Sequence, residues 1–190
     1  MKNLTMSDRI AICNLCVEAG AKTALMEVDD IALHYLHEHG REPKACFASD
    51  ADAHFAAVYD IDLSTITPIV AKPHFVDNVC PAKEAAGVKI DEAFLGSCNN
   101  GRIEDLRVGA ELLKGRKVHP LVRFLVVPAS QAVYQQALKE GLLKIFMEAG
   151  AIVMNPNCSV CWGSCQGVIG EGETLISTGT RNFKGRAGHR

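Results

Sequence analysis

The chain has 190 residues, of which 48% are hydrophobic, and its 20 lysine and arginine residues nearly balance its 22 aspartate and glutamate residues. This length and composition predict a folded protein with a buried core, in one large or two small domains. The net charge of −2 provides no general basic surface for nucleic acid or for an anionic membrane. The apolar stretches are too short to span a bilayer and residues 1–8 lack the apolar core of a secretory signal, so we expect a cytoplasmic protein.

Residues 1–68 are predicted to form part of an α/β domain that begins with two helices. Thr5 is a candidate N-cap for a helix that runs to about Ala19 and is ended by Gly20. A second helix is expected from Asp29 to His39, because a glycine follows directly.

The next part of the chain has a weaker pattern. Residues 50–59 are expected to form a short helix, followed by a strand near residues 61–66. Prolines at positions 68, 73 and 81 then indicate an extended connector, which we assign to residues 69–88.

From residue 89 to residue 190 the pattern predicts a second α/β domain, in which strands alternate with helices. This alternation is typical of a parallel sheet with helices layered against it. The expected strands cover residues 93–95, 122–127, 151–154 and 174–177, and the expected helices cover residues 103–113, 131–139 and 142–149.

Eight cysteines are many for a chain of this length. In a cytoplasmic protein they are expected to stay reduced, with some buried in the core and others bound to metal. We assign Cys13, Cys16, Cys46 and Cys80 to the core, and we expect Cys165 to neighbour a metal site without binding to it.

Three further cysteines lie in positions typical of metal ligands. Cys158 and Cys161 form a C-x-x-C motif in a loop rich in glycine. Cys98 lies where a predicted strand ends and a helix opens, and the free backbone N–H groups of such a turn favour a thiolate. Because open α/β sheets bind ligands at the carboxyl ends of their strands, we expect both motifs at the same edge.

Two kinds of metal centre fit these residues. Structural zinc requires four ligands, so Cys165 or a histidine would have to complete the set. Three cysteines would instead hold an iron–sulfur cubane in which one iron has no protein ligand and can act as a Lewis acid. A non-catalytic metal-binding module is therefore an alternative to an enzyme.

The motifs together resemble those of the aconitase superfamily, in particular the large subunits of 3-isopropylmalate dehydratases. Residues 96–107, GSCNNGRIEDLR, are similar to the segment G-S-C-T-N-G-R-x-E-D-L-R of that family. Residues 155–161 resemble its N-P-x-C-x-x-C loop, and residues 181–186 resemble its R-N-F-x-G-R signature. Residues 12–21 and 72–79 also resemble family segments, so the similarity covers nearly the whole chain.

This resemblance implies an iron–sulfur hydro-lyase that isomerises a 2-hydroxy carboxylic acid by dehydration and rehydration. The expected enzyme is 3-isopropylmalate dehydratase of leucine biosynthesis, with homoaconitase and 2,3-dimethylmalate dehydratase as alternatives. Cys98, Cys158 and Cys161 are implied as the ligands of a [4Fe–4S] cluster. The family's catalytic histidines, and the small subunit whose swivelling domain carries a serine base, lie outside these residues, so the chain alone is expected to be inactive.

The same resemblance implies roles for five other residues. Asn14 and Glu18 would form a catalytic pair on one helix face, with the amide supporting the cluster and the carboxylate contacting the substrate hydroxyl. Arg181 and Arg186 would bind substrate carboxylates through their bidentate guanidinium groups. Thr180 stands where the family has asparagine, and its hydroxyl is expected to donate to the cluster.

Overall fold

A computed structural model describes residues 3–189 of the chain, which divide into two compact units with the boundary after Pro68. The predicted connector, residues 69–88, lies within the second unit. Residues 1, 2 and 190 of the predicted domain ranges lie outside the described residues. Within the described part of the chain, no helix combines the length and the apolar character needed to cross a membrane.

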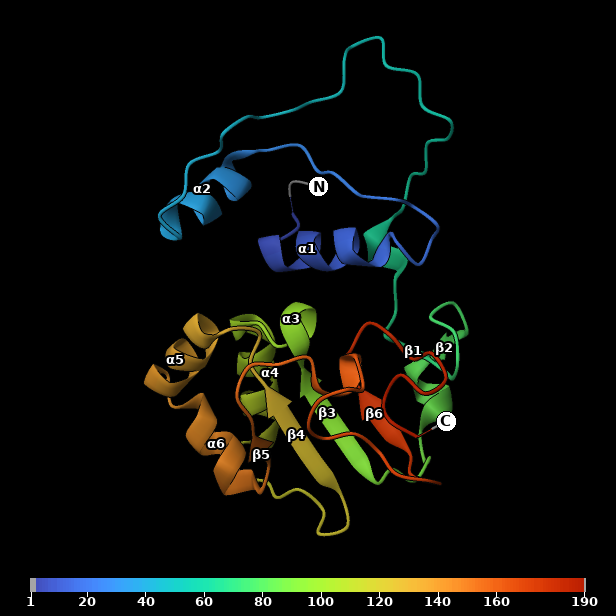
Figure 1. Ribbon diagram of the computed structural model, residues 1–190, viewed down its shortest axis with the longest axis vertical. Helices are drawn as coiled ribbons and strands as arrows, with labels where there is room; N and C mark the ends of the chain where they lie inside the picture. The colour runs from blue at the N-terminus through green and yellow to red at the C-terminus, as the bar shows by residue number, and fades with distance from the viewer. Residues whose placement is uncertain (1–2, 190) are drawn as a thin grey trace. The chain divides into compact units, whose positions relative to one another are not determined.

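The first unit contains two short helices joined by an ion pair. Helix α1 (Met6–Leu15) begins at the predicted cap Thr5, and helix α2 (Asp30–Glu38) begins after Asp29 (Figure 1). Arg9 is buried and donates to both carboxylate oxygens of Asp29 over 2.7 Å. These hydrogen bonds hold the pKa of Asp29 well below its usual range. The side chain that caps the second helix therefore also anchors the first.

Helix α1 is shorter than the sequence predicted. Its α-helical span ends at Leu15, and the backbone N–H groups of Glu18 and Gly20 bond to carbonyl groups only three residues earlier. Gly20 has a φ of +85° and closes this tighter turn, as glycine does at many helix ends. Asn14 therefore lies in the last turn of the helix, whereas Glu18 lies in the tighter turn that follows it.

Residues 41–62 form neither a helix nor a strand, so the predicted helix at residues 50–59 is wrong. In place of the predicted strand at residues 61–66, a 3-10 turn occupies Leu63–Thr65 (η1). The large apolar side chains of this segment, such as Phe55 at 63% exposed, have no core to pack on. Short helices are marginal without an apolar face buried by tertiary packing, which explains the error.

The second unit contains a four-stranded parallel sheet in the order β5-β4-β3-β6 (Figure 1). The predicted parallel α/β architecture is therefore confirmed. The strands are β3 (Glu92–Gly96), β4 (Arg123–Val127), β5 (Ile152–Val153) and β6 (Leu175–Ser177), and the helices are α3 (Ser97–Asn100), α4 (Ile103–Leu113), α5 (Gln131–Lys139) and α6 (Leu142–Ala149).

Successive strand residues point to opposite faces of the sheet, and both sets are buried, so both faces are covered. Leu95 and Val126 pack with Leu106 and Phe146 of the helices α4 and α6. The neighbouring residues Phe94, Leu125 and Val127 pack on the other face against Met154 and Val160. Val160 lies between the two cysteines of the C-x-x-C motif, so core packing positions that loop.

The predicted connector contains a hairpin rather than a single extended segment. Strands β1 (Ile69–Ala71) and β2 (Val79–Pro81) pair antiparallel, and a 3-10 turn, η2 (Ala82–Ala85), follows. Cys80 lies on β2 and is buried, as predicted. The same prediction is wrong for Cys46, which is exposed, and for Cys13 and Cys16, which are only partly buried. Across residues 3–68 the only buried side chain is that of Arg9, so this unit offers these thiols no core.

Candidate metal centre

The candidate residues of the second unit follow the carboxyl ends of three parallel strands. Cys98 comes directly after β3, Cys158 and Cys161 follow β5, and Thr180 follows β6. The ends of parallel strands meet at one edge of a sheet, where open α/β proteins bind their ligands. The fold therefore places motifs that are far apart in sequence at one end of the sheet.

The turn that carries Cys98 is formed by close backbone packing. A Cβ atom at Gly96 would lie only 2.6 Å from the carbonyl oxygen of Val127, so β3 can approach β4 here only with glycine. Ser97 follows with a φ of +76° and is 1% exposed, which is an unusual backbone conformation for a buried serine. The next residue, Cys98, lies in the short helix α3 and is exposed.

The C-x-x-C loop keeps its inner residues buried and its cysteines accessible. Ser159 is fully buried, and its hydroxyl donates to the carbonyl oxygen of Gln166 over 2.8 Å. Val160 is also buried, in the core described above. Cys158 therefore remains exposed and Cys161 partly exposed, on either side of two anchored residues.

The surroundings of Cys158 disfavour its thiolate form. Burial raises the pKa of Cys158, and the nearby thiols of Cys98, Cys165 and Cys161 raise it further, whereas the Arg186 guanidinium lowers it. Among the described residues, no three histidine, cysteine or acidic side chains are grouped tightly enough to hold a single metal ion. In a cubane each thiolate binds a different iron, so its ligands lie farther apart than those of one zinc ion. The zinc alternative gains no support from this arrangement.

Three buried polar atoms near Cys98 have no hydrogen-bond partner within the described residues: the Ser97 hydroxyl oxygen, Asn100 Oδ1 and Arg102 Nε. Buried polar groups without partners are rare in native proteins. A hydroxyl and a guanidinium N–H are both donors, so they suit a ligand that carries hydrogen-bond acceptors.

Arg181 and Arg186 both contact the loops of this edge. Arg186 donates from Nε to the carbonyl oxygen of Cys161 over 2.6 Å. A Cβ atom at Gly163 would collide with the carbonyl oxygen of Arg186, so the two segments pack backbone to backbone. Arg181 donates from Nη1 to the hydroxyl of Thr180 over 2.9 Å. Two pairs of predicted site residues are therefore hydrogen-bonded, Arg186 with Cys161 and Arg181 with Thr180.

Asn182 positions a neighbouring segment of the chain, a role that the sequence analysis did not assign to it. Its side-chain amide donates to the carbonyl oxygens of Ala71, Lys72 and Phe75, at 3.3, 2.7 and 3.1 Å. The following residue, Phe183, packs edge-on against Phe75, with ring centroids 6.4 Å apart. The centre of the R-N-F-x-G-R motif therefore anchors the β1–β2 hairpin. The motif itself was the only signal, since the hairpin is over 100 residues away in sequence.

Comparison with known proteins identifies the family. The model of the aconitase family (aconitate hydratase) matches residues 1–190. The chain belongs to the aconitase family.

Relatives of this aconitase-family chain include 3-isopropylmalate dehydratase large subunits. Those of Aquifex aeolicus and Hydrogenobaculum sp. are 48% and 47% identical over 194 and 189 residues, and both comparisons cover the whole of this chain. The subunit of Acetivibrio thermocellus is 46% identical over 187 residues, or 98% of this chain. The chain spans 45% of the length of each of these relatives.

Asn14 and Glu18, to which the family motif assigns a catalytic role, lie in the first unit. Asn14 lies near the end of α1 and Glu18 in the turn that follows, and both are partly buried. Their catalytic role remains a prediction from the family motif.

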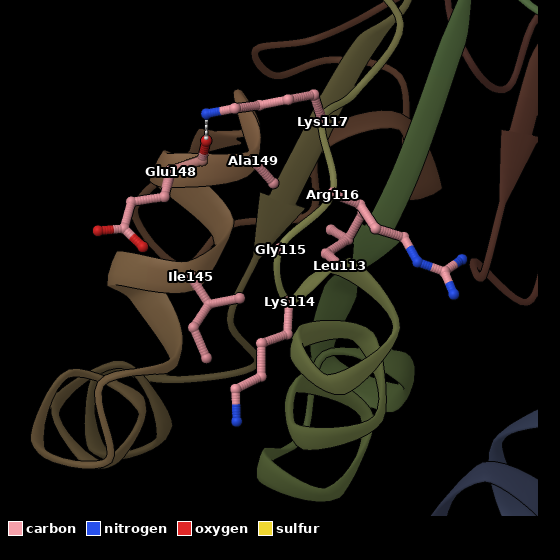
Figure 2. Close-up of a pocket in the computed structure, with 8 residues that line it drawn as sticks. All are labelled: Leu113, Lys114, Gly115, Arg116, Lys117, Ile145, Glu148 and Ala149. Carbon is pink, nitrogen blue, oxygen red and sulfur yellow. Dashed lines mark hydrogen bonds between the residues drawn. The ribbon is translucent and has the colours of Figure 1, made fainter.

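A pocket on the helical side of the second unit is separate from the cysteines. It lies between the end of α4 and helix α6, and its lining includes Lys114, Lys117 and Glu148 (Figure 2). Lys117 donates from Nζ to the backbone carbonyl of Glu148 over 2.6 Å, in the last turn of α6. Cations commonly stabilise helix C-termini in this way. The Lys117 contact therefore stabilises the end of α6, and no predicted site residue lines the pocket.

Proposed function

We propose that this chain is the part of a 3-isopropylmalate dehydratase large subunit that holds its [4Fe–4S] cluster, in leucine biosynthesis. The observation that carries the proposal is the gathering of Cys98, Cys158 and Cys161 at one edge of a parallel sheet, with Arg186 beside them. Identity of 46–48% to proteins of that name supports the choice of reaction.

The residues at this edge fit such a cluster. Cys98 and Cys161 both act on the pKa of Cys158, and all three cysteines follow strand ends at the same edge of the sheet. The unpartnered donors of Ser97 and Arg102 suit the sulfides of a cluster, which accept hydrogen bonds. The positive charge of Arg186 offsets part of the negative charge that three thiolates bring together.

The proposed reaction removes water from a 2-hydroxy carboxylic acid and adds it back, without net redox change. When bound, the cluster supplies a Lewis-acidic iron for the substrate hydroxyl. Cys98, Cys158 and Cys161 would hold three of the four irons, and the fourth would have no protein ligand.

The remaining residues of the proposed site bind and orient the substrate. Arg181 and Arg186 hold its carboxylates in the bidentate geometry that guanidinium allows. Thr180 positions Arg181 through the hydrogen bond from Nη1 and keeps its own hydroxyl proton available for the cluster. For Glu18 and Asn14, in the first unit, we keep the role that the family motif implies, toward the hydroxyl group that leaves and returns.

We further propose a cytoplasmic location and a small-subunit partner. All eight cysteines are free, and the cytoplasm keeps thiols reduced and available for iron. The base that removes the proton α to a carboxylate would come from the swivelling domain of the small subunit. These 190 residues alone are expected to bind the cluster without turning over substrate.

Anaerobic reconstitution with ferrous iron and sulfide tests the proposal most simply. We expect iron and acid-labile sulfide in equal amounts, and broad visible absorption that bleaches with a chelator. A protein that binds a single zinc ion in preference to iron would contradict it. The substrate is tested by assaying the complete two-subunit enzyme with 3-isopropylmalate, homocitrate and 2,3-dimethylmalate, of which we expect the first to be preferred.

A further inference from the structure

The loop that carries the R-N-F-x-G-R motif is fastened at both of its ends. Before the motif, the backbone N–H of Thr178 bonds to the carbonyl oxygen of Phe94 over 3.0 Å, at the end of the pairing between β6 and β3. At the end of the motif, Arg186 donates to the carbonyl oxygen of Cys161 over 2.6 Å. Arg181 lies between these two anchors, so a further support for the middle of the loop bears on its position.

The middle of this loop rests on the β1–β2 hairpin. Asn182 directly follows Arg181 and donates from its side-chain amide to three carbonyl oxygens of the hairpin, of which that of Lys72 is the nearest at 2.7 Å. The ring of Phe183 packs edge-on against that of Phe75, with centroids 6.4 Å apart. The two residues that follow Arg181 therefore both contact the same turn of the hairpin.

The hairpin has hydrogen bonds of its own that hold its shape. The backbone N–H of Lys72 bonds to the carbonyl oxygen of Asn78 over 2.8 Å. The side-chain amide of Asn78 donates to the carbonyl oxygen of Pro73 over 3.0 Å. Cys80 on β2 is buried, so this strand is packed on one side. The hairpin can therefore support the loop.

The guanidinium of Arg181 stands at the end of a long side chain, so a small shift of the loop backbone displaces it. Its hydrogen bond to the Thr180 hydroxyl joins two neighbouring residues of the same loop, and such a bond moves with the loop. The contacts of Asn182 differ, because they reach a segment more than 100 residues away in sequence. They fix the loop relative to another part of the unit.

We propose that Asn182 is a positioning residue, which ties the loop to the β1–β2 hairpin and so holds the Arg181 guanidinium toward a carboxylate of the substrate. The substrate contact rests on the proposed function. The tether itself is a property of the chain and is tested without any measurement of activity.

Hydrogen–deuterium exchange of the 190-residue chain tests the tether. In Asn182→Ala, exchange in peptides that cover residues 69–81 should accelerate several-fold, because one amide supplies three of the bonds that hold the hairpin to the loop. Peptides that cover β4 should exchange as in the wild type. Unchanged exchange in the hairpin would overturn the proposal, whether or not the chain binds a cluster.

Steady-state kinetics of the complete two-subunit enzyme tests the positioning of Arg181. In Asn182→Ala, KM for 3-isopropylmalate should rise at least about tenfold, since misplacing a binding group by about an ångström can cost roughly a hundredfold in rate. The kcat and the cluster spectrum should stay near the wild type, because loss of a contact made equally in the ground state and the transition state raises KM alone. A lower kcat with an unchanged KM and a weakened spectrum would show a structural role and overturn the proposal. A wild-type enzyme that binds no cluster would contradict the proposed function instead.

A double-mutant cycle asks whether Asn182 acts through Arg181. In an Arg181→Lys background, adding Asn182→Ala should change kcat/KM by less than about twofold, because the guanidinium that Asn182 positions is already absent. Losses that multiply in the double variant would show that Asn182 acts on another part of the site.

Two variants of the hairpin complete the test. Asn78→Ala removes an amide that donates within the hairpin and leaves the tether in place, so KM should stay near the wild type. An equal rise in KM would show that the shape of the hairpin matters and the tether does not. If Asn182→Ala does not fold, as judged by circular dichroism, Phe75→Ala removes the ring contact from a side chain that is 65% exposed and must still raise KM. An unchanged KM in Phe75→Ala would then overturn the proposal.

Discussion

Arg186 donates a hydrogen bond from Nε to the backbone carbonyl oxygen of Cys161, over 2.6 Å. This contact joins the R-N-F-x-G-R motif to the C-x-x-C loop, which precedes it by more than 20 residues. Both partners are partly buried. The arginine that the sequence assigned to substrate binding therefore also supports the backbone of a proposed cluster ligand.

Replacing Arg186 by lysine should weaken cluster binding although the charge is kept, because lysine has no N–H at the Nε position. A hydrogen bond from a charged donor contributes about 1.5–3 kcal/mol, so the affinity for the cluster should fall at least about tenfold. Iron retained per chain during titration with a chelator measures this. Arg107→Lys is the matched control, since Arg107 makes a two-point contact with Glu140 away from the cysteines. Equal iron loss in both variants would contradict the role of the Cys161 contact.

Arg181→Lys should reduce substrate use in the complete two-subunit enzyme and leave the cluster spectrum intact. Lysine cannot form the bidentate contact that orients a carboxylate. Truncating one partner of a buried charge pair costs roughly 2–5 kcal/mol, and the lysine variant should lose less than Arg181→Ala. The measurement is kcat/KM beside the visible spectrum. If the spectrum collapses together with activity, Arg181 supports the fold near Thr180 and does not bind substrate.

Gly163→Ala should destabilise the cysteine loop more than a substitution with the same backbone strain elsewhere. Gly163 has a φ of +78°, and an added Cβ would collide with the Arg186 carbonyl oxygen. Gly172 has a φ of +74°, with nothing within 4 Å of an added Cβ. A left-handed backbone costs roughly 1–2 kcal/mol for a residue with a side chain, and both variants should show that loss. We expect a further fall in the melting temperature and in cluster content for Gly163→Ala alone. Equal melting temperatures for Gly163→Ala and Gly172→Ala would show that the added Cβ does not collide with the Arg186 carbonyl oxygen.

At the opposite end of the sheet, Arg123 joins the buried carboxylate of Glu92 to Glu173. Its guanidinium donates to Glu92 over 2.9 and 3.0 Å and to Glu173 over 2.6 Å. Arg123→Ala would leave Glu92 buried without its partner. We expect a loss below the roughly 3–5 kcal/mol typical of a fully buried pair, because Arg123 is 44% exposed. The double variant Arg123→Ala with Glu92→Leu should recover much of this loss in thermal unfolding. No recovery would mean that Arg123 acts mainly through Glu173.

The two carboxylates of this cluster should respond to pH in opposite directions. Hydrogen bonds from Arg123 lower the pKa of Glu173 to about 2. The stability that Glu173 contributes is therefore complete above the unfolded pKa of about 4.3 and is lost as the pH falls toward 2. Burial raises the pKa of Glu92, so its contribution favours the fold at low pH and declines as the pH rises through that raised value. In unfolding experiments from pH 2 to pH 7, Glu173→Gln should flatten the rise in stability with pH, and an unchanged slope would contradict this assignment.

The sheet and its helices were predictable because their signals are local. Phe94 and Leu95 form a short apolar run before Gly96, and Ser130 caps the helix it precedes, so the neighbouring residues determine each element. Residues 50–66 also contain large apolar side chains, yet these residues form no α-helix and no strand. A pattern of apolar residues predicts structure only where another surface covers them.

The sequence is enough to propose the cysteines as site residues, whereas it does not show the contacts that position their loops. Two motif cysteines and a strand end are visible in sequence, but the three acceptors of Asn182 and the bond from Arg186 to Cys161 join distant segments. The end of the first helix was not predictable, because the residues before Gly20 give the same pattern whether they continue the α-helix or tighten into a turn.

Cluster reconstitution in single cysteine variants tests the central claim most directly. Alanine at Cys98, Cys158 or Cys161 should abolish the visible absorption of the reconstituted cluster, because each removes one of three thiolate ligands. Alanine at Cys13, Cys46 or Cys80 should leave the absorption and the iron content at the wild-type level. If Cys13 and Cys16 prove essential while Cys98→Ala still binds the cluster, the assignment of the metal centre to this edge of the sheet is wrong.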